Sequence, residues 1–554
     1  MRARLDCGRM RHADTAFISP ARRLCFLLLL AGCESPVRLM PTPVSFRSGD
    51  VDPFEKAGYQ VQGTDLPVFC VTNRGAVIEK PEPIHTLLPS ERLRMGVAHM
   101  RVRDDTLDWE TLHRLSTSDD PDKRPIVHLK ALEQMAALGP GDNVAGSADA
   151  QAFFASVNKA LAASEKKELV VYVHGANNTV ARASAQAAQL RHFTGRRVVM
   201  LSFLWPSTGS ILRYVTDVGH AAASVAPFAR MIEALAENTQ ASSIEVVAFS
   251  AGAQSVSPGL VRLATPWPGE TREQLRQRLR LSQVYFAAPD IDTRRFANEL
   301  AQCIDIVGRV SIAANLHDSA LRFSAVVNRG SRASSANLTE LNEEQTGFLV
   351  DVSRKLGFDI VKVAPTTIPK LPPRLHGFWF EDPWVSGDVL GLLLNAEPQR
   401  RGLEPQEDPQ GTHYWTFPPD FHDRVQRLFI RARRLQARDR RMFRAVPTAD
   451  GSYVLRKRVS SRTDNEVRGI NDATFDVLAS QGQQLRRSEV GLNAAATRRK
   501  LRSRRMNRGV SGSNRGRSPV GQSLACLPGT LAVDPGHSAG CGADGACARR
   551  RPSG

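Results

Sequence analysis

Short apolar runs alternate with helical patterns through the middle of the chain. Short apolar runs begin at positions 168, 197, 244, 281 and 309, and each is typical of a buried strand; the run at 244 is also rich in β-branched residues. Apolar residues at helical spacing occupy 150–164, 180–194 and 215–236, where Pro227 allows a kink. This alternation predicts an α/β fold with a mostly parallel sheet and helices on both faces.

The patterns of apolar residues on either side of this central region are weaker. Two strands are predicted at 67–72 and 93–102, with a turn at 139–142. Residues 375–384 form a loop rich in aromatic side chains, and 389–395 a short helix. The helix expected after residue 250 should be shortened or kinked at Pro258.

Charge is unevenly distributed between the body and the C-terminal part of the chain. The net charge is +18, and residues 421–554 carry 28 Lys and Arg against 10 Asp and Glu, so the first 420 residues sum to zero. A near-neutral body is not one built to grip nucleic acid. The extension is Arg-rich and then rich in Gly, Ala and Ser, so it should be largely disordered, and it either binds an anionic surface or is simply solvated.

The N-terminus has the order of features found in exported proteins. Arg22 and Arg23 precede an eight-residue apolar run, which is too short to span a bilayer and of signal-peptide length. The run ends in Leu30-Ala-Gly-Cys33, which resembles the bacterial lipobox, so cleavage before a lipidated Cys33 is expected. That resemblance implies a lipid anchor in the cell envelope. Glu34 gives no signal for inner-membrane retention, which favours the outer membrane, facing the periplasm.

These patterns divide the chain into a signal peptide at 1–32, a Pro-containing tether at 33–63, a folded α/β domain at 64–420 and a basic extension at 421–554. Of eight cysteines only Cys70 and Cys303 lie in the body, and whether they pair is open. No Cys/His spacing suggests a metal, and no cofactor is predicted.

Ser250 is the principal candidate for chemistry. It follows the run that begins at 244 and is flanked by Ala248 and Gly252, as in the G-x-S-x-G nucleophile elbow with Ala for the first Gly. Small residues are needed on both sides because the backbone is crowded where a strand turns sharply into a helix. The string alone is also compatible with a serine that caps a buried helix.

Further motifs accompany this elbow in a fixed order. They are Val173-His-Gly-Ala-Asn-Asn178, Ser202-Phe-Leu-Trp-Pro-Ser207, Ala287-Ala-Pro-Asp-Ile-Asp292, His376-Gly-Phe-Trp379 and Pro383-Trp-Val-Ser-Gly-Asp388. Together they resemble the α/β-hydrolase superfamily, and most closely a poorly characterised bacterial branch, over about two thirds of the chain. The order Ser, acid, His is the one that this fold demands.

The resemblance implies a serine hydrolase of the esterase or lipase type. Ser250 would be the nucleophile, His376 the base in preference to His192, His220 or His317, and Asp318 the acid, with Asp290 or Asp292 as alternatives. The N–H groups of Ala251 and of Gly175 or Ala176 would form the oxyanion hole.

The expected partner is a small-molecule or lipid-like acyl substrate, and protein partners stay undefined. Asn177, Asn178 and Trp205 should line or brace the pocket. The departures at Ala248 and at Phe249, where many hydrolases have His, leave the substrate open and allow a different function. That alternative is a catalytically idle binding or scaffold lipoprotein with the same fold.

Overall fold

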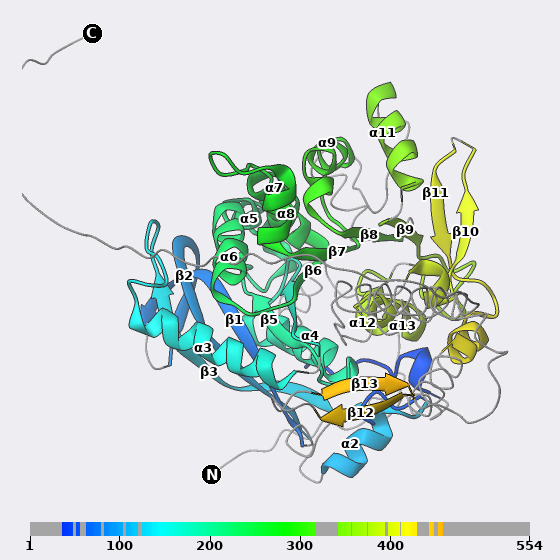
Figure 1. Ribbon diagram of the computed structural model, residues 1–554, viewed down its shortest axis with the longest axis horizontal. Helices are drawn as coiled ribbons and strands as arrows, with labels where there is room; N and C mark the ends of the chain where they lie inside the picture. The colour runs from blue at the N-terminus through cyan, green and yellow to red at the C-terminus, as the bar shows by residue number, and fades with distance from the viewer. Residues whose placement is uncertain are drawn as a thin grey trace, which may run out of the picture. The chain divides into compact units, whose positions relative to one another are not determined.

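An eleven-stranded sheet forms the centre of the structure, which is a computed structural model (Figure 1). The chain divides into two units, Met1–Gln484 and Leu485–Gly554, and every described residue lies in the first. The structure describes residues 36–47, 51–55, 63–78, 82–103, 107–119, 124–164, 166–315, 342–355, 357–373, 375–393, 397–409 and 411–428, and the backbone of 443–447 and 453–457.

The strands follow the order β10-β11-β9-β8-β7-β6-β4-β5-β1-β2-β3 across the sheet. Their bounds are β1 Asp65–Ile78, β2 Ile84–Arg103, β3 Ile126–Leu138, β4 Glu168–Val173, β5 Val199–Phe203, β6 Ser243–Phe249, β7 Leu281–Ala287, β8 Arg309–Ala314, β9 Phe358–Lys362, β10 Glu404–Glu407 and β11 His413–Thr416. The strands from β11 to β1 are parallel, whereas β2, β3 and β10 pair antiparallel at the edges. A separate hairpin pairs β12 Phe443–Pro447 with β13 Tyr453–Lys457.

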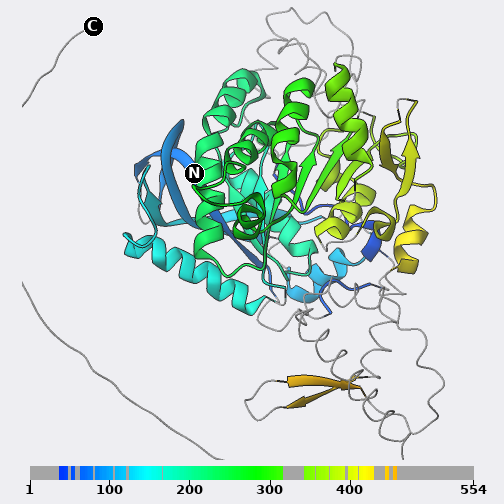
Figure 2. The same ribbon diagram turned by 45° about the horizontal axis from the view of Figure 1, so that its top comes forward.

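Helices cover both faces of this sheet (Figures 1 and 2). Successive side chains of a strand point to opposite faces, so Val171 of β4 packs under one helical layer and Tyr172 under the other. The first layer contains α3 Ala148–Ala163, α5 Tyr214–Ala223, α6 Val225–Asn238, α7 Ala253–Leu263, α8 Arg272–Leu279, α9 Thr293–Cys303 and α11 Glu343–Ser353. The second contains α2 Trp109–Ser116, α4 Val180–Phe193, α12 Phe378–Glu381 and α13 Pro383–Leu393. The predicted mostly parallel sheet with helices on both faces is therefore confirmed.

Two prolines act differently from the prediction. The expected helix at 215–236 is broken at Ser224, and Pro227 sits in the first turn of α6, where its missing N–H costs no hydrogen bond. Pro258 lies inside α7, which nevertheless continues to Leu263. Gly259 beside it is required by packing, because a Cβ there would lie 2.5 Å from the Phe228 ring of α6.

The segment predicted as a tether is in part a component of the core. Leu39, Met40, Val44 and Phe46 are all buried, and the Met40 N–H donates to Gln189 Oε1 at 2.7 Å. Residues 36–47 and 51–55 thus belong to the folded body, and the tether prediction of 33–63 is wrong for them. The domain also continues past residue 420, since Phe421 is fully buried. Cys33 and the predicted signal peptide lie outside the described residues, as does most of the basic extension.

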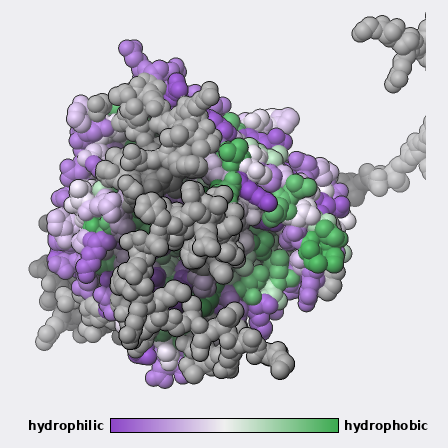
Figure 3. Space-filling model, turned by 180° about the vertical axis from the view of Figure 1, so that it is seen from behind, coloured by the Kyte–Doolittle hydropathy of each residue, from purple (hydrophilic) through white to green (hydrophobic). Residues whose placement is uncertain are grey.

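The β1–β2 hairpin exposes a group of apolar side chains. Val77, Ile78, Ile84, Leu87 and Leu88 are 40–75% exposed, and Figure 3 shows hydrophobic surface on the side of the molecule where these strands lie. β1, β5, β4 and β6 are all parallel, so the C-terminal ends of β1 and β6 lie on the same side of the sheet, where the strands end. Within the described residues, no helix is both long and apolar enough to cross a bilayer.

Both cysteines of the described body are free thiols. Cys70 lies on β1 and Cys303 at the end of α9, and both are buried. Burial raises the pKa of each thiol to about 12. Neither side chain therefore forms a thiolate at neutral pH, and both act as small core residues.

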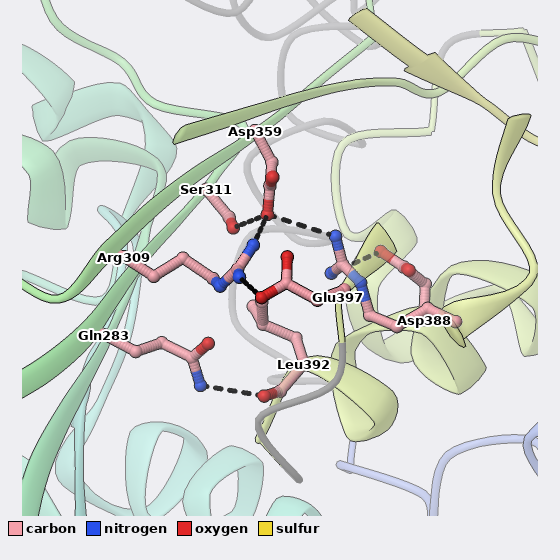
Figure 4. A network of polar contacts seen from close by, with 8 residues as sticks. Gln283, Arg309, Ser311, Asp359, Asp388, Leu392 and Glu397 are labelled. Atoms are coloured by element: carbon pink, nitrogen blue, oxygen red, sulfur yellow. Dashed lines mark hydrogen bonds and ion pairs between the residues drawn. The ribbon is translucent and has the colours of Figure 1, made fainter. Parts of the chain in front are cut away.

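A buried polar network joins α13 to the end of the sheet opposite β3 (Figure 4). Asp359 of β9 accepts hydrogen bonds from Arg309 and Ser311 at 2.8 Å each, and Arg401 bridges it to Asp388 at 3.4 Å on either side. Gln283 of β7 donates to the Leu392 carbonyl at 2.8 Å. Burial raises the pKa of Asp388 to about 6, although the Arg401 guanidinium opposes this shift.

Candidate functional site

Ser250 occupies a sharp turn between β6 and α7. Its φ is +52°, in the left-handed region that non-glycine residues rarely adopt, and it begins a short 3-10 turn, Ser250–Gly252. Such a conformation costs of the order of 1 kcal/mol or more and persists only where surrounding contacts impose it. The strained turn is the geometry of a nucleophile elbow.

Close backbone contacts explain the small residues around this turn. A Cβ on Gly252 would lie 2.8 Å from the carbonyl oxygens of Val173 and His174, which leave β4 beside it. A Cβ on Gly175 would lie 2.8 Å from the Ser250 Cβ. The end of β4 and the elbow can therefore pack together only with glycine at both positions.

His376 reaches the elbow from a loop beyond β9. Its Nε2 lies 2.8 Å from the Ser250 Oγ. Asn315, which follows β8, donates to the Leu375 carbonyl at 3.2 Å, and the Phe249 ring lies 5.1 Å from the imidazole. The pair can transfer a proton from the Ser250 hydroxyl to the imidazole, as a Ser–His nucleophile requires.

The described alternatives to His376 have other roles. Arg196 donates to His192 Nδ1, so His192 Nε2 carries the proton and donates to Ser116 Oγ at 2.8 Å. A histidine in this tautomer cannot act as a base toward that serine. His220 Nδ1 donates to the Pro206 carbonyl at 2.7 Å. His317 lies outside the described residues.

The acid of the site remains a prediction. Asp318, the preferred candidate, lies outside the described residues. Asp290 is buried, accepts a 2.5 Å hydrogen bond from the Tyr214 hydroxyl, and donates its N–H to the Ser250 carbonyl at 3.1 Å. Asp292 caps α9 by accepting from the Arg295 N–H. Asp290 thus braces the elbow and Asp292 begins a helix.

The loop after β4, whose Gly175 packs against Ser250, carries two backbone donors that no acceptor in the described part of the chain uses. Neither the Gly175 nor the Ala176 N–H has an acceptor among the described residues. Trp205 Nε1 donates to the His174 carbonyl at 2.7 Å, and Asn178 Nδ2 donates to the Gly175 carbonyl at 3.1 Å. Because N–H and C=O point in opposite directions across a trans peptide, these bonds fix the directions of the two free N–H groups.

His174 contributes to the loop as a neutral side chain. It is fully buried, and burial lowers its pKa to about 3. Its Nδ1 therefore donates to the Gly175 carbonyl at 2.8 Å, and its ring stacks on Trp205 with centroids 4.8 Å apart. Trp205 and Asn178 thus contact the loop backbone, as the sequence suggested, whereas Tyr214 and Asn315 carry no motif by which sequence reasoning could have found them.

A match to a protein-family model agrees with this fold. Residues 149–364 match the family model described as alpha/beta hydrolase of unknown function (DUF900), a span that includes Gly175 and Ser250 but ends before His376. With the observed sheet, this match identifies the fold as α/β-hydrolase-like and supports a hydrolase type of function.

One solved structure is also similar, an esterase from Thermogutta terrifontis described as "esterase 2 phosphoramylated by tabun". The two sequences are 12% identical, and the matched region covers 42% of this chain and 82% of the esterase. The TM-score of the superposition is 0.24. No curated protein matches the sequence. In the described part of the chain, no group of three or more His, Cys, Asp or Glu side chains is arranged to hold a metal ion.

Proposed function

We propose that the protein is a serine hydrolase of the esterase or lipase type, which cleaves a carboxylic ester or similar acyl substrate. The observation that carries the proposal is the 2.8 Å contact between His376 Nε2 and the Oγ of Ser250, a residue held in a strained elbow. A buried serine that only capped a helix would need neither the left-handed backbone nor a histidine from a distant loop.

The chemistry follows from these positions. Ser250 Oγ attacks the acyl carbon while its proton passes to His376 Nε2, and the carbonyl oxygen becomes an oxyanion facing the N–H groups of Ala251 and of Gly175 or Ala176. The intermediate collapses as His376 returns the proton to the leaving alkoxide, which departs as an alcohol. Water then attacks the acyl carbon while His376 Nε2 accepts a proton from it, and the second intermediate collapses as His376 returns that proton to Ser250 Oγ and the carboxylic acid is released.

The acid in this proposal is Asp318, which would hold the His376 imidazole in the tautomer whose Nε2 is free to accept. Asp290 and Asp292 remain the alternatives. The Tyr214 and Arg295 contacts support ordinary bracing and capping roles for these two aspartates.

A fluorophosphonate probe combined with ester hydrolysis tests the proposal. Wild-type protein should be labelled at Ser250 and should hydrolyse short p-nitrophenyl esters, whereas Ser250→Ala should lose labelling and several orders of magnitude in rate. Ser257→Ala is a matched control, because Ser257 lies on the following helix and bonds Glu299 instead of His376. Equal rates for wild type and Ser250→Ala would leave the idle scaffold as the better interpretation.

The location of the enzyme is part of the same proposal. Lipidation at Cys33 would anchor the body to a membrane of the cell envelope, and the leader sequence favours the outer membrane. An acyl substrate from lipid is consistent with such a place.

A further inference from the structure

A buried carboxylate lies directly behind the loop that follows β4. Asp217 of α5 is fully buried. Its Oδ2 accepts from the Asn177 N–H at 2.8 Å and from the Ser207 hydroxyl at 2.7 Å, and its Oδ1 accepts from the Thr208 N–H at 2.7 Å. One side chain therefore gathers donors from two separate loops.

These bonds join the exits of β4 and β5. Ser207, which donates to Asp217, also accepts from the Asn178 N–H at 3.0 Å. Asn177 has a left-handed φ of +55°, a conformation that Asn adopts more readily than most residues, and its N–H is held there by Asp217. The Asn178 side-chain amide in turn donates from Nδ2 to the Gly175 and Ala176 carbonyls at 3.1 Å each.

A buried arginine balances the charge of Asp217. Arg74 of β1 donates to the Trp205 and Ser207 carbonyls at 3.1 and 2.9 Å, and the Asp217 carboxylate opposes the fall that burial causes in its pKa. A buried carboxylate without such compensation would be expensive. In the loop after β5, Arg74 binds the backbone carbonyls and Asp217 binds the N–H and hydroxyl donors. This loop is therefore a fixed support for the loop after β4.

We propose that Asp217 is a positioning residue for the oxyanion loop, which holds peptide groups 174–176 so that their free N–H groups face the carbonyl oxygen of a substrate at Ser250. This inference rests on the proposed hydrolase function. Asp217 lies 40 positions from Asn177, on a helix that contributes no residue to the Ser–His pair, and acts through the loop backbone. Its contribution should consequently be to the stabilisation of the transition state rather than to substrate binding.

Asp217→Asn is the sharpest variant because it keeps the side-chain shape. Its amide has one acceptor oxygen and one NH2 group, so at least one of the three donors would face another donor. We expect kcat on a p-nitrophenyl ester to fall about 100-fold, the scale of a lost oxyanion donor, with KM changed less than about twofold. Inhibition by a trifluoromethyl ketone, which forms a tetrahedral adduct, should weaken by a similar factor. Asp305→Asn, at an exposed aspartate paired with Arg272, is the control and should match wild type.

Fluorophosphonate titration separates positioning from loss of structure. Rates are calculated per titratable Ser250, so a variant that merely unfolds in part keeps wild-type kcat for its active fraction. If Asp217→Asn fails to fold, Ser207→Ala serves instead, because it leaves the Asn177 and Thr208 bonds to Asp217, and it should lower kcat about tenfold.

Three outcomes would overturn the inference. The first is an unchanged kcat per titrated site in the variant that folds, and the second is a rise in KM as large as the fall in kcat. The third is a fall in kcat while the affinity for the trifluoromethyl ketone stays unchanged. Wild-type protein that does not react with the probe would instead overturn the proposed function, and this inference with it.

Discussion

Gly175 lies against Ser250 so closely that a β-carbon on the glycine would come within 2.8 Å of the serine Cβ. The same β-carbon would lie 3.2 Å from the Phe249 carbonyl oxygen. This contact joins the loop that offers free N–H groups to the residue proposed as nucleophile. The distance between donor and nucleophile is therefore set by backbone packing, and a single methyl group should alter it.

Gly175→Ala tests this dependence. The added methyl group must displace either the loop or the elbow, and a displacement of about 1 Å near reacting atoms can cost about 100-fold in rate. Overpacking should also lower the free energy of unfolding by roughly 1–3 kcal/mol. The measurement is ester hydrolysis together with thermal unfolding. Gly219→Ala on α5 is the matched control, because a β-carbon there has no neighbour within 4 Å, and its activity should stay at the wild-type level.

His376 should be essential while other histidines are not. His376→Ala removes the group that accepts the Ser250 proton, and we expect hydrolysis to fall by roughly 1,000-fold or more. Addition of free imidazole should restore part of the activity if the missing function is proton transfer. His99→Gln, at an exposed residue paired with Glu133, controls for general effects of losing a histidine. Similar activity of His376→Ala and wild type would exclude this residue as the base.

Three aspartate variants identify the acid. Asp318→Asn should lower kcat by about 10⁴-fold, as expected when the imidazole loses the partner that fixes its tautomer. Asp292→Asn should retain activity, because Asn is also a good helix cap. Asp290→Asn should have a moderate effect through the Tyr214 contact. If Asp290→Asn shows the 10⁴-fold loss and Asp318→Asn does not, the assignments must be exchanged.

The middle strands of the sheet, β4 to β8, were predictable because they are short, buried and apolar. The same rule gave no indication of β3, whose segment is rich in Ala, Leu, Lys, Glu, Gln and Met and becomes a strand through pairing along β2. Tertiary pairing overrides local propensity at such an edge. The Ser250 elbow and the His-Gly loop were visible as local motifs, and His376 through chain order.

Asp217 and Arg74 could not be predicted as parts of the site. Asn177, which connects Asp217 to the loop after β4, lies 40 positions from it, and the carbonyls that Arg74 contacts lie 131 and 133 positions away, so no local spacing records these contacts. The tether prediction failed for a related reason. Its prolines and small residues resemble a linker, but Leu39, Met40 and Val44 find a core to pack against only in the folded protein.

Asp388 should make stability depend on pH. Its pKa in the folded protein is about 6, above the ordinary 3.8, so the folded state binds the proton more tightly than the unfolded state does. The stability linked to this proton is fully present below pH 3.8 and is lost as the pH rises through about 6. The difference between the two pKa values corresponds to roughly 3 kcal/mol.

Urea unfolding of wild type and Asp388→Asn at pH 4.5 and 7.5 measures this effect. Between these two values the stability of the variant relative to wild type should increase, by less than the full 3 kcal/mol because the transition begins below pH 4.5. Arg401 keeps its contact with Asp359 in the variant, which limits the cost of the substitution. A difference between the two proteins that does not change with pH would contradict a raised pKa at Asp388.

Lipidation at Cys33 would hold the body close to the membrane, because the folded part begins almost at once. Val37, four residues after Cys33, already accepts a hydrogen bond from the Val127 N–H at 2.8 Å. Four extended residues span at most about 14 Å. Val127 is near the N-terminal end of β3, whereas Ser250 follows the C-terminal end of β6. Two antiparallel pairings give β3 the same sense as β1 and β6, so the attachment point and Ser250 lie at opposite ends of the strands.

We therefore expect a membrane-anchored enzyme whose active site faces away from the bilayer that holds it. Radiolabelled palmitate should be incorporated into wild type and not into Cys33→Ala, and mass spectrometry should find an acylated Cys33 as the mature N-terminus. Anchored and Cys33→Ala proteins should hydrolyse a soluble short-chain ester at similar rates, since the bilayer would not cover Ser250. An unmodified N-terminus would refute the anchor. A several-fold slower anchored enzyme, with lipidation confirmed, would refute only the orientation.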